Sequence, residues 1–292
     1  MKMLKSFAFL LVTMLLIVPS VGQSQSGSSE VKRYLIVPLG WQGEPDSGNS
    51  LEWVTTTTLH NLSDSLKQVK IGNFDNNGNL AELQYIFGNG ETGIGQRAFL
   101  QVNAGRTLTF TNSTSRSAMS GVIEFTIPTT NGELDVEIET AYQLSIVDKG
   151  GKRTISVTSV GVAEPGKSFR AHVISTAKAE TGLAVYNPQD LPVNVDLLLY
   201  NTYSGQTYDM YTYKFSVLAK VSFSLGPHQV VSRFVGEIFP NLPADSAGNR
   251  VTEGDVQVSA SLPVVAAASR VDSDRNRSMY STVKTISIKP EK

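Results

Sequence analysis

The chain contains three histidines and no cysteine, so few side chains are available for nucleophilic or metal-assisted chemistry. His60, His172 and His228 each stand alone in a strand-like or turn-like segment, without the close pairing of a zinc motif. No Gly-x-Ser-x-Gly sequence offers the nucleophile of an α/β-hydrolase. Without cysteine there is no disulfide, no cysteine zinc site and no thiol nucleophile. These observations predict a protein that is not an enzyme and has no catalytic residues, metal or cofactor.

Four carboxylates alternate with apolar residues in one predicted strand, and paired carboxylates are the catalytic groups of glycoside hydrolases. They are Glu133, Asp135, Glu137 and Glu139. Successive side chains of a strand point to opposite faces, so all four should share one face and the apolar residues the other. We therefore expect a solvated acidic stripe over a buried apolar face, and not a catalytic pair.

Two short motifs carry the residue types of nucleotide or calcium binding without the required context. The glycines of a G-x-G-x-x-G match are Gly88, Gly90 and Gly93. The next segment, 96–102, reads as a strand and not as the helix that would hold a pyrophosphate. Alternating oxygen ligands of the calcium-loop type are Asp272, Asp274 and Asn276. They lack the following glycine and the closing bidentate glutamate. The similar run at 73–78 has its glycine, Gly78, but also lacks the closing glutamate. We expect residues 75–78 to form the turn of a hairpin between 71–74 and 80–87. We interpret all three segments as turns.

Five tyrosines crowd around a Ser-Gly turn and are the residues best suited to contact a ligand. They are Tyr200, Tyr203, Tyr208, Tyr211 and Tyr213. Strand alternation points Tyr211 and Tyr213 inward and Tyr200 and Tyr208 outward, with Tyr203 near the tip. Exposed aromatic rings stack on sugars or anchor protein interfaces, so Tyr200, Tyr203 and Tyr208 are candidate ligand-binding residues. The alternative is that cross-strand tyrosine pairs stabilise a hairpin. The same two alternatives, contact with a ligand or local stabilisation, apply to Trp41 and Trp53.

The elements that position these residues read as strands. Hydrophobic residues make up 40% of the chain and charged residues only 17%, and runs of Val, Ile, Thr, Phe and Tyr are cut by Gly, Asn, Asp and Pro. The best helical segment, 234–239, predicts one or two turns closed by Pro240. The net charge of −1 excludes the basic footprint of a nucleic-acid-binding protein. The sequence predicts an all-β fold.

The first residues predict export. Residues 1–22 have two lysines, an apolar run over 7–18, Pro19 and a small-residue end, which is the pattern of a cleaved signal peptide. The polar segment 23–32 should be a flexible start to the mature chain. The apolar run is shorter than a membrane-spanning helix, and no later stretch is long enough. We expect a periplasmic or secreted protein with no membrane span after signal cleavage.

The second half of the chain repeats the first. Residues 54–74 align with 180–200, residues 120–128 with 253–263, and residues 153–159 with 284–290. The aligned pairs include Asn61 with Asn187, Val69 with Val195, Phe74 with Tyr200 and Gly121 with Gly254. Each unit has the length and strand spacing of an immunoglobulin-like sandwich. We predict two tandem immunoglobulin-like β-sandwich domains, at 33–162 and 168–292, joined by a short linker at 163–167.

The second half also resembles a known module. Its segments TGLAVYNPQDLPVNVDLLLY, GPHQVVSRFVGEIFPNLP and VQVSASLPVVAAASR are similar to a module of uncharacterised secreted proteins from soil bacteria. The resemblance covers roughly residues 180–274, and its motifs are turn and core positions. It implies an immunoglobulin-like β-sandwich without catalytic residues. The first half lacks the Asn-Pro and Phe-Pro steps of this pattern.

Three functional hypotheses follow from these patterns. The leading one is an exported, non-catalytic structural, adhesive or assembly protein that docks partner proteins at edge strands or loops. The second is a carbohydrate-binding protein that uses exposed tyrosine or tryptophan. The third is a hydrolase with a site between the two domains.

The carbohydrate hypothesis makes a direct prediction. If the outward tyrosines stack on sugar rings, the Tyr200→Ala/Tyr208→Ala double variant should fold normally and lose retention on the polysaccharide that the wild-type chain binds. Affinity electrophoresis in a panel of soluble polysaccharides, with circular dichroism of both proteins, measures this. Absence of retention of the wild-type chain in every gel would contradict the hypothesis.

Overall fold

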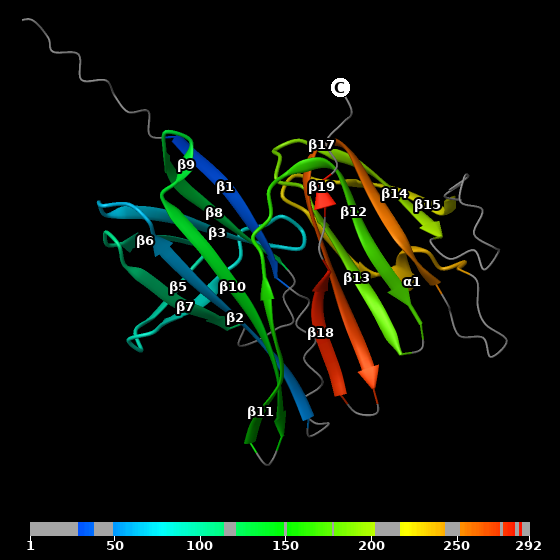
Figure 1. Ribbon diagram of the computed structural model, residues 1–292, viewed down its shortest axis with the longest axis horizontal. Helices are drawn as coiled ribbons and strands as arrows, with labels where there is room; N and C mark the ends of the chain where they lie inside the picture. The colour runs from blue at the N-terminus through cyan, green and yellow to red at the C-terminus, as the bar shows by residue number, and fades with distance from the viewer. Residues whose placement is uncertain are drawn as a thin grey trace, which may run out of the picture.

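The computed structural model describes residues 29–37, 49–113, 121–148, 151–176, 178–201, 217–242, 252–274, 277–283 and 286–287. Within these ranges the chain is nearly all strand, with one short helix (Figure 1). The all-β prediction is confirmed. The predicted signal peptide lies outside the described residues. Residues 29–32, expected in a flexible tail, are instead strand, because they pair with residues 126–129.

The strands of the first half form two sheets. One has the order β1-β8-β3-β6, with β9 beside β8, and the other has the order β11-β10-β2-β7-β4-β5. Their bounds are β1 Ser29–Val37, β2 Asn49–Asn61, β3 Lys67–Asp75, β4 Leu83–Phe87, β5 Thr92–Gly95, β6 Arg97–Val102, β7 Thr107–Ser113, β8 Gly121–Thr130, β9 Glu133–Leu134, β10 Val136–Asp148 and β11 Gly151–Val160. Both sheets contribute to one core, in which Leu59, Phe110 and Phe125 are fully buried.

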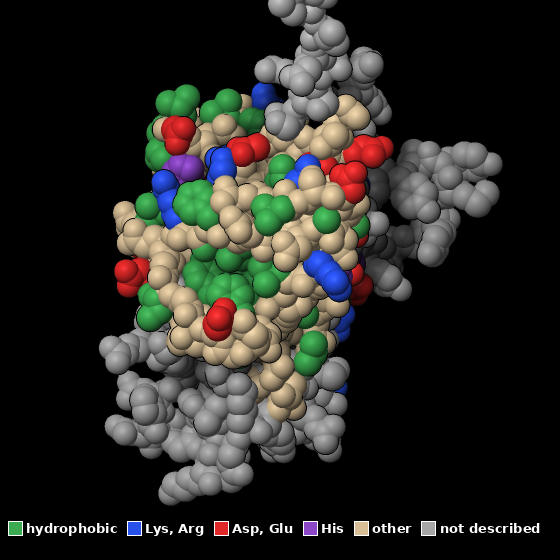
Figure 2. All heavy atoms as spheres, turned by 90° about the vertical axis from the view of Figure 1, so that its left-hand side faces the viewer, with side chains coloured by type: hydrophobic (Ala, Val, Ile, Leu, Met, Phe, Trp, Pro, Cys, Tyr) green, Lys and Arg blue, Asp and Glu red, His purple; other side chains and the backbone are tan. Residues whose placement is uncertain are grey.

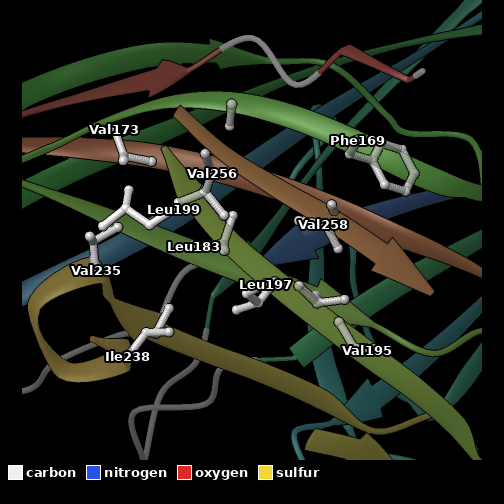
Figure 3. Close-up of a cluster of buried hydrophobic side chains, with 14 of the residues drawn as sticks. Phe169, Val173, Leu183, Val195, Leu197, Leu199, Val235, Ile238, Val256 and Val258 are labelled. Carbon is white, nitrogen blue, oxygen red and sulfur yellow. The ribbon is translucent and has the colours of Figure 1, made fainter. Parts of the chain in front are cut away.

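The second half is built around one long strand. Its elements are β12 Gly166–Ser175, β13 Ala179–Tyr186, β14 Val193–Asn201, β15 Val217–Leu225, β16 Val230–Phe234, α1 Val235–Ile238, β17 Thr252–Asp274, β18 Arg277–Val283 and β19 Ile286–Ser287. The early part of β17 pairs with β12 and β14, and its later part with β13 and β18. Side chains from both parts meet in one core that α1 also enters (Figure 3). The short helix predicted at 234–239 is confirmed.

The predicted alternation in β14 is also confirmed. Val193, Val195, Leu197 and Leu199 are all at most 1% exposed, and the residues between them are exposed or half-buried. This face lies in the core of the second half, so the two-residue spacing of the apolar residues marks the buried face of β14.

The strand order of the first half recurs in the second. The series β1-β8-β3-β6 corresponds to β12-β17-β14-β15, and β11-β10-β2-β7 corresponds to β18-β17-β13-β16. The aligned residues Asn61 and Asn187 have the same role. Each side-chain amide donates a 2.8 Å hydrogen bond to the carbonyl four residues later, of Ser65 or Leu191. Each Oδ1 accepts the backbone N–H two residues later.

Gly121 and Gly254 also occupy one structural position. Gly121 pairs with Asp75, and Gly254 with Asn201. A Cβ atom at either glycine would lie about 2.3 Å or 2.2 Å from the carbonyl oxygen of the preceding partner residue, Phe74 or Tyr200. The third alignment is wrong. Residues 153–159 lie in β11, which pairs with β10, whereas β19 pairs with β12 and the counterpart of β11 is β18.

Gly254→Ala should therefore destabilise the protein. The added methyl group would meet a backbone oxygen that the sheet holds in place, so we expect a loss of about 1–3 kcal/mol in the free energy of unfolding. Gly161→Ala is the matched control, because a Cβ there has no atom within 4 Å. Urea denaturation of the two variants measures the difference, and equal midpoints would contradict the packing argument.

Two local expectations were wrong. Asp135 is not part of a solvated stripe: it is 7% exposed and forms a 2.9 Å ion pair with Lys67. It lies between β9 and β10, where the alternation is interrupted, while the other three carboxylates are exposed. The turn at 75–78 does not lead into a hairpin of two full strands. Only Phe74 and Leu80 form a bridge, and β4 then pairs in the other sheet.

The two halves share an apolar junction between the outer faces of their sheets. It buries Tyr34, Ile36 and Val122 from the first half against Ala184, Tyr186, Val230 and Val265 from the second. The segment between the halves is also tied to β1, because Tyr34 and Ala163 exchange two backbone hydrogen bonds of 3.1 and 2.8 Å. Strand β11 of the first half also lies beside β18 of the second half (Figure 1).

Aromatic rings and a histidine make the junction specific. The Phe74 ring stacks on His228 with centroids 4.7 Å apart, and the Tyr34 and Tyr186 rings are 5.5 Å apart. His228 lies 3.1 Å from the Tyr186 hydroxyl and 3.0 Å from Asp190 Oδ1. Burial, reinforced by the Glu124 carboxylate, raises the pKa of both Tyr34 and Tyr186 above the usual tyrosine value.

The junction tyrosines predict a loss of stability at alkaline pH. Above a pH of about 10 the unfolded chain ionises its tyrosines, whereas Tyr34 and Tyr186 stay neutral in the folded protein. Because the folded state then holds more protons than the unfolded state, its free energy of unfolding falls as pH rises. The Tyr34→Phe/Tyr186→Phe variant should show a shallower fall in urea denaturation across this range. An unchanged slope would contradict the assignment.

Candidate binding groove between strands β15 and β16

Only part of the predicted tyrosine cluster can be placed. Tyr200 lies in β14, is half-buried, and its hydroxyl donates a 3.3 Å hydrogen bond to Gln257 Oε1 on the neighbouring β17. The partner is a glutamine and not a second tyrosine. Tyr203, Tyr208, Tyr211 and Tyr213 lie outside the described residues, as do Trp41 and the side chain of Trp53.

The three histidines lie beside separate carboxylates. His60 is 3.3 Å from Glu139, His172 is 3.3 Å from both Glu253 and Asp255, and His228 is near Asp190. Within the described ranges, no three His, Cys, Asp or Glu side chains gather as a metal site. Asp272 and Asp274 lie in β17 opposite β18, with their side chains outside the description, and Asn276 is not described.

A feature that sequence reasoning missed is an apolar groove in the second half. A cavity of about 170 Å³ opens between the two layers, where β15 and β16 are the last strands of the described sheet. Its apolar wall comes from β13, β14, β15, β16 and α1, and consists of Leu183, Val185, Leu197, Val221, Phe223, Val231 and Ile238. Ser224 and Arg233 add the polar groups.

The groove lies at an edge of this core that no described residue covers. Phe223 corresponds to Leu100 of the first half, since Phe223 pairs with Val195 as Leu100 pairs with the aligned Val69. Leu100 is 8% exposed and buried, whereas Phe223 is only partly buried. The apolar period of β15 is thus the one expected for a core strand, but among the described residues no strand corresponding to β4 lies over it.

In the first half, strand β4 provides that cover. It pairs with β7 and places Tyr85 and Phe87 against Phe110, with ring centroids 5.7 and 6.2 Å apart. In the second half β16 takes the place of β7, and among the described residues no strand pairs with its other edge. Residues 202–216, at the matching point of the sequence, lie outside the described residues.

The position of Phe110 is occupied by an arginine in the second half. Phe110 pairs with Thr57, and Arg233 pairs with the aligned residue Leu183. Phe110 is completely buried, while Arg233 is exposed at the rim of the groove. Sequence alignment alone did not reveal this exchange, because the spacing between the repeats changes after β14. The groove therefore combines an apolar floor with one cationic group.

A second apolar surface lies on the first half. Figure 2 shows hydrophobic side chains gathered around a shallow hollow on the face opposite the junction. Ile94 of β5 and Phe99 of β6 are 74% and 61% exposed. Both strands end their sheets. This surface is a shallow hollow, whereas the groove is a defined cavity, so the groove is the better-defined candidate.

The groove combines an apolar floor, the last described strand of the sheet and one cation. The groove residues include no nucleophile with an adjacent base. No helix among the described residues is long and apolar enough to cross a membrane. In comparisons with known proteins, no family model, no curated protein and no solved structure matches this chain.

Proposed function

We propose that the chain is an exported, non-catalytic assembly or adhesion protein of two tandem immunoglobulin-like modules, which binds partner proteins through the groove between β15 and β16. The observation that carries this proposal is the apolar core that no described residue covers at that edge. The groove offers pockets for the apolar side chains of an extended segment.

The repeat within the chain supports the proposal of two tandem modules. The first half has two sheets, and the second half has one eight-stranded sheet whose long strand β17 takes part in both layers of the core. One strand order used twice suits two modules of the immunoglobulin-like type. The resemblance of residues 180–274 to a module of secreted proteins fits the same architecture. The junction between the halves suits a rigid pair, because β1 contributes Leu35 to one core and Tyr34 and Ile36 to the junction.

Selection of linear peptides tests the proposed function. A phage-displayed library of random peptides, panned on the immobilised protein, should enrich sequences in which large apolar residues alternate. Val221→Arg puts a charged side chain into the groove and should abolish this enrichment, because the apolar floor would no longer accept those residues. Each protein is first checked for folding by circular dichroism and thermal melting.

The matched control is Ser222→Arg, which adds the same charge to the next residue of β15. Ser222 is exposed and its hydroxyl contacts Asp196 on the opposite face of the sheet. This variant should select the same peptides as the wild type. No alternating peptides, or equal enrichment on the Val221→Arg protein, would reject the groove as the binding surface.

A further inference from the structure

A group of polar side chains interrupts the apolar core of the first half. Thr57 of β2, Asn73 of β3 and Asn112 of β7 are each at most 5% exposed. Four of their polar atoms are buried without a hydrogen-bond partner among the described residues. These atoms are Asn112 Nδ2 and Oδ1, Thr57 Oγ1 and Asn73 Oδ1. Because burying a polar atom without a partner costs free energy, such atoms point to a bound guest.

Strand register brings Thr57 and Asn112 together. Thr57 of β2 pairs with Phe110 of β7, two residues before Asn112. Residues two apart in a strand point to the same face, so Thr57 and Asn112 are diagonal neighbours on the inner face of one sheet. Asn73 belongs to the opposite sheet, where its Nδ2 donates a hydrogen bond to the hydroxyl of Tyr85, the residue opposite Asn112 on β4. The atoms without partners therefore lie in one part of the core.

The second half has apolar side chains at the three matching positions. The pairs are Thr57 with Leu183, Asn73 with Leu199, and Asn112 with Val235. The last pair follows from register, because Asn112 comes two residues after Phe110 and Val235 two residues after Arg233. The three apolar residues are buried together in the core of the second half (Figure 3). The shared strand order thus accepts apolar residues at these places, and the fold alone does not require polar ones.

The chemistry of these side chains restricts the guest. A hydroxyl and two amides are neutral, so they do not compensate the cost of burying an ion. Together they offer an N–H donor and several oxygen acceptors, and a water molecule both donates and accepts. Buried waters typically form about three hydrogen bonds to polar groups that have no other partner.

From these observations we infer that the first half binds ordered water inside its core, between β2 and β7. The water accepts a hydrogen bond from Asn112 Nδ2 and donates one to Thr57 Oγ1. Asn73 Oδ1 is a further acceptor in the opposite sheet. This site belongs to the first half and does not depend on the groove of the second.

Magnetic relaxation dispersion of water oxygen-17 tests the inference on the full protein, because it detects water that stays inside a protein for longer than the protein takes to rotate. Asn112→Val introduces the residue type of the matching position in the second half. It should lower the dispersion amplitude of the wild type by the amount of at least one water molecule. Asn194→Val makes the same exchange at an exposed residue of β14 and should keep the wild-type amplitude.

Thr57→Val gives a second measurement, because it keeps the branched shape of the side chain and replaces only the hydroxyl. It should also lower the amplitude, since the water loses one partner and exchanges faster. Thermal melting verifies that each variant is folded. Absence of dispersion in the wild type, or an unchanged amplitude in both core variants, would overturn the inference.

Discussion

A β-sandwich buries its core only where both of its layers extend over it, and the two halves of this protein differ at one edge for that reason. In the first half β4 extends its sheet past β7, and Phe110 is completely buried. In the second half β16 is the last described strand of its sheet, and inward-facing Phe223 stays partly exposed. The remaining core strands match between the halves, so the groove stands out as a local departure from a shared plan.

The junction gives this groove a fixed setting. Strand β16 takes part in both regions, because Val230 lies in the junction and Val231 lines the groove. Contacts from the first half reach the start of β16 directly, since the Val230 N–H donates a 3.2 Å hydrogen bond to the Asn76 carbonyl. The last described strand beside the groove is therefore held by the first half as well as by its own sheet.

The polar side chains described above differ in whether they have a partner within the protein. Asn61 and Asn187 satisfy loop carbonyls at matching corners, and Asp135 pairs with Lys67 beneath a bend. Arg233 differs from them, because it lies at the rim of an apolar cavity without an ion-pair partner among the described residues.

Local patterns in the sequence determined the fold class and much of the repeat. The period of two in β14 identified its buried face, and the aligned pairs Asn61–Asn187 and Gly121–Gly254 have equivalent backbone positions. These features depend on residues close together in the chain or on the geometry of one strand pair. Of the five clustered tyrosines, only Tyr200 lies within the described residues.

Tertiary structure alone decided which layer covers each apolar face. The carboxylate of Asp135 is buried because a bend breaks the alternation. Strand β4 does not pair with β3, which precedes it in the chain, but joins the other sheet beside β7. The exchange of Phe110 for Arg233 is visible only through strand register, since the sequence spacing between the repeats changes along the chain. Periodicity records that a face is apolar, whereas its cover is set by pairing between distant strands, and that pairing leaves no local pattern.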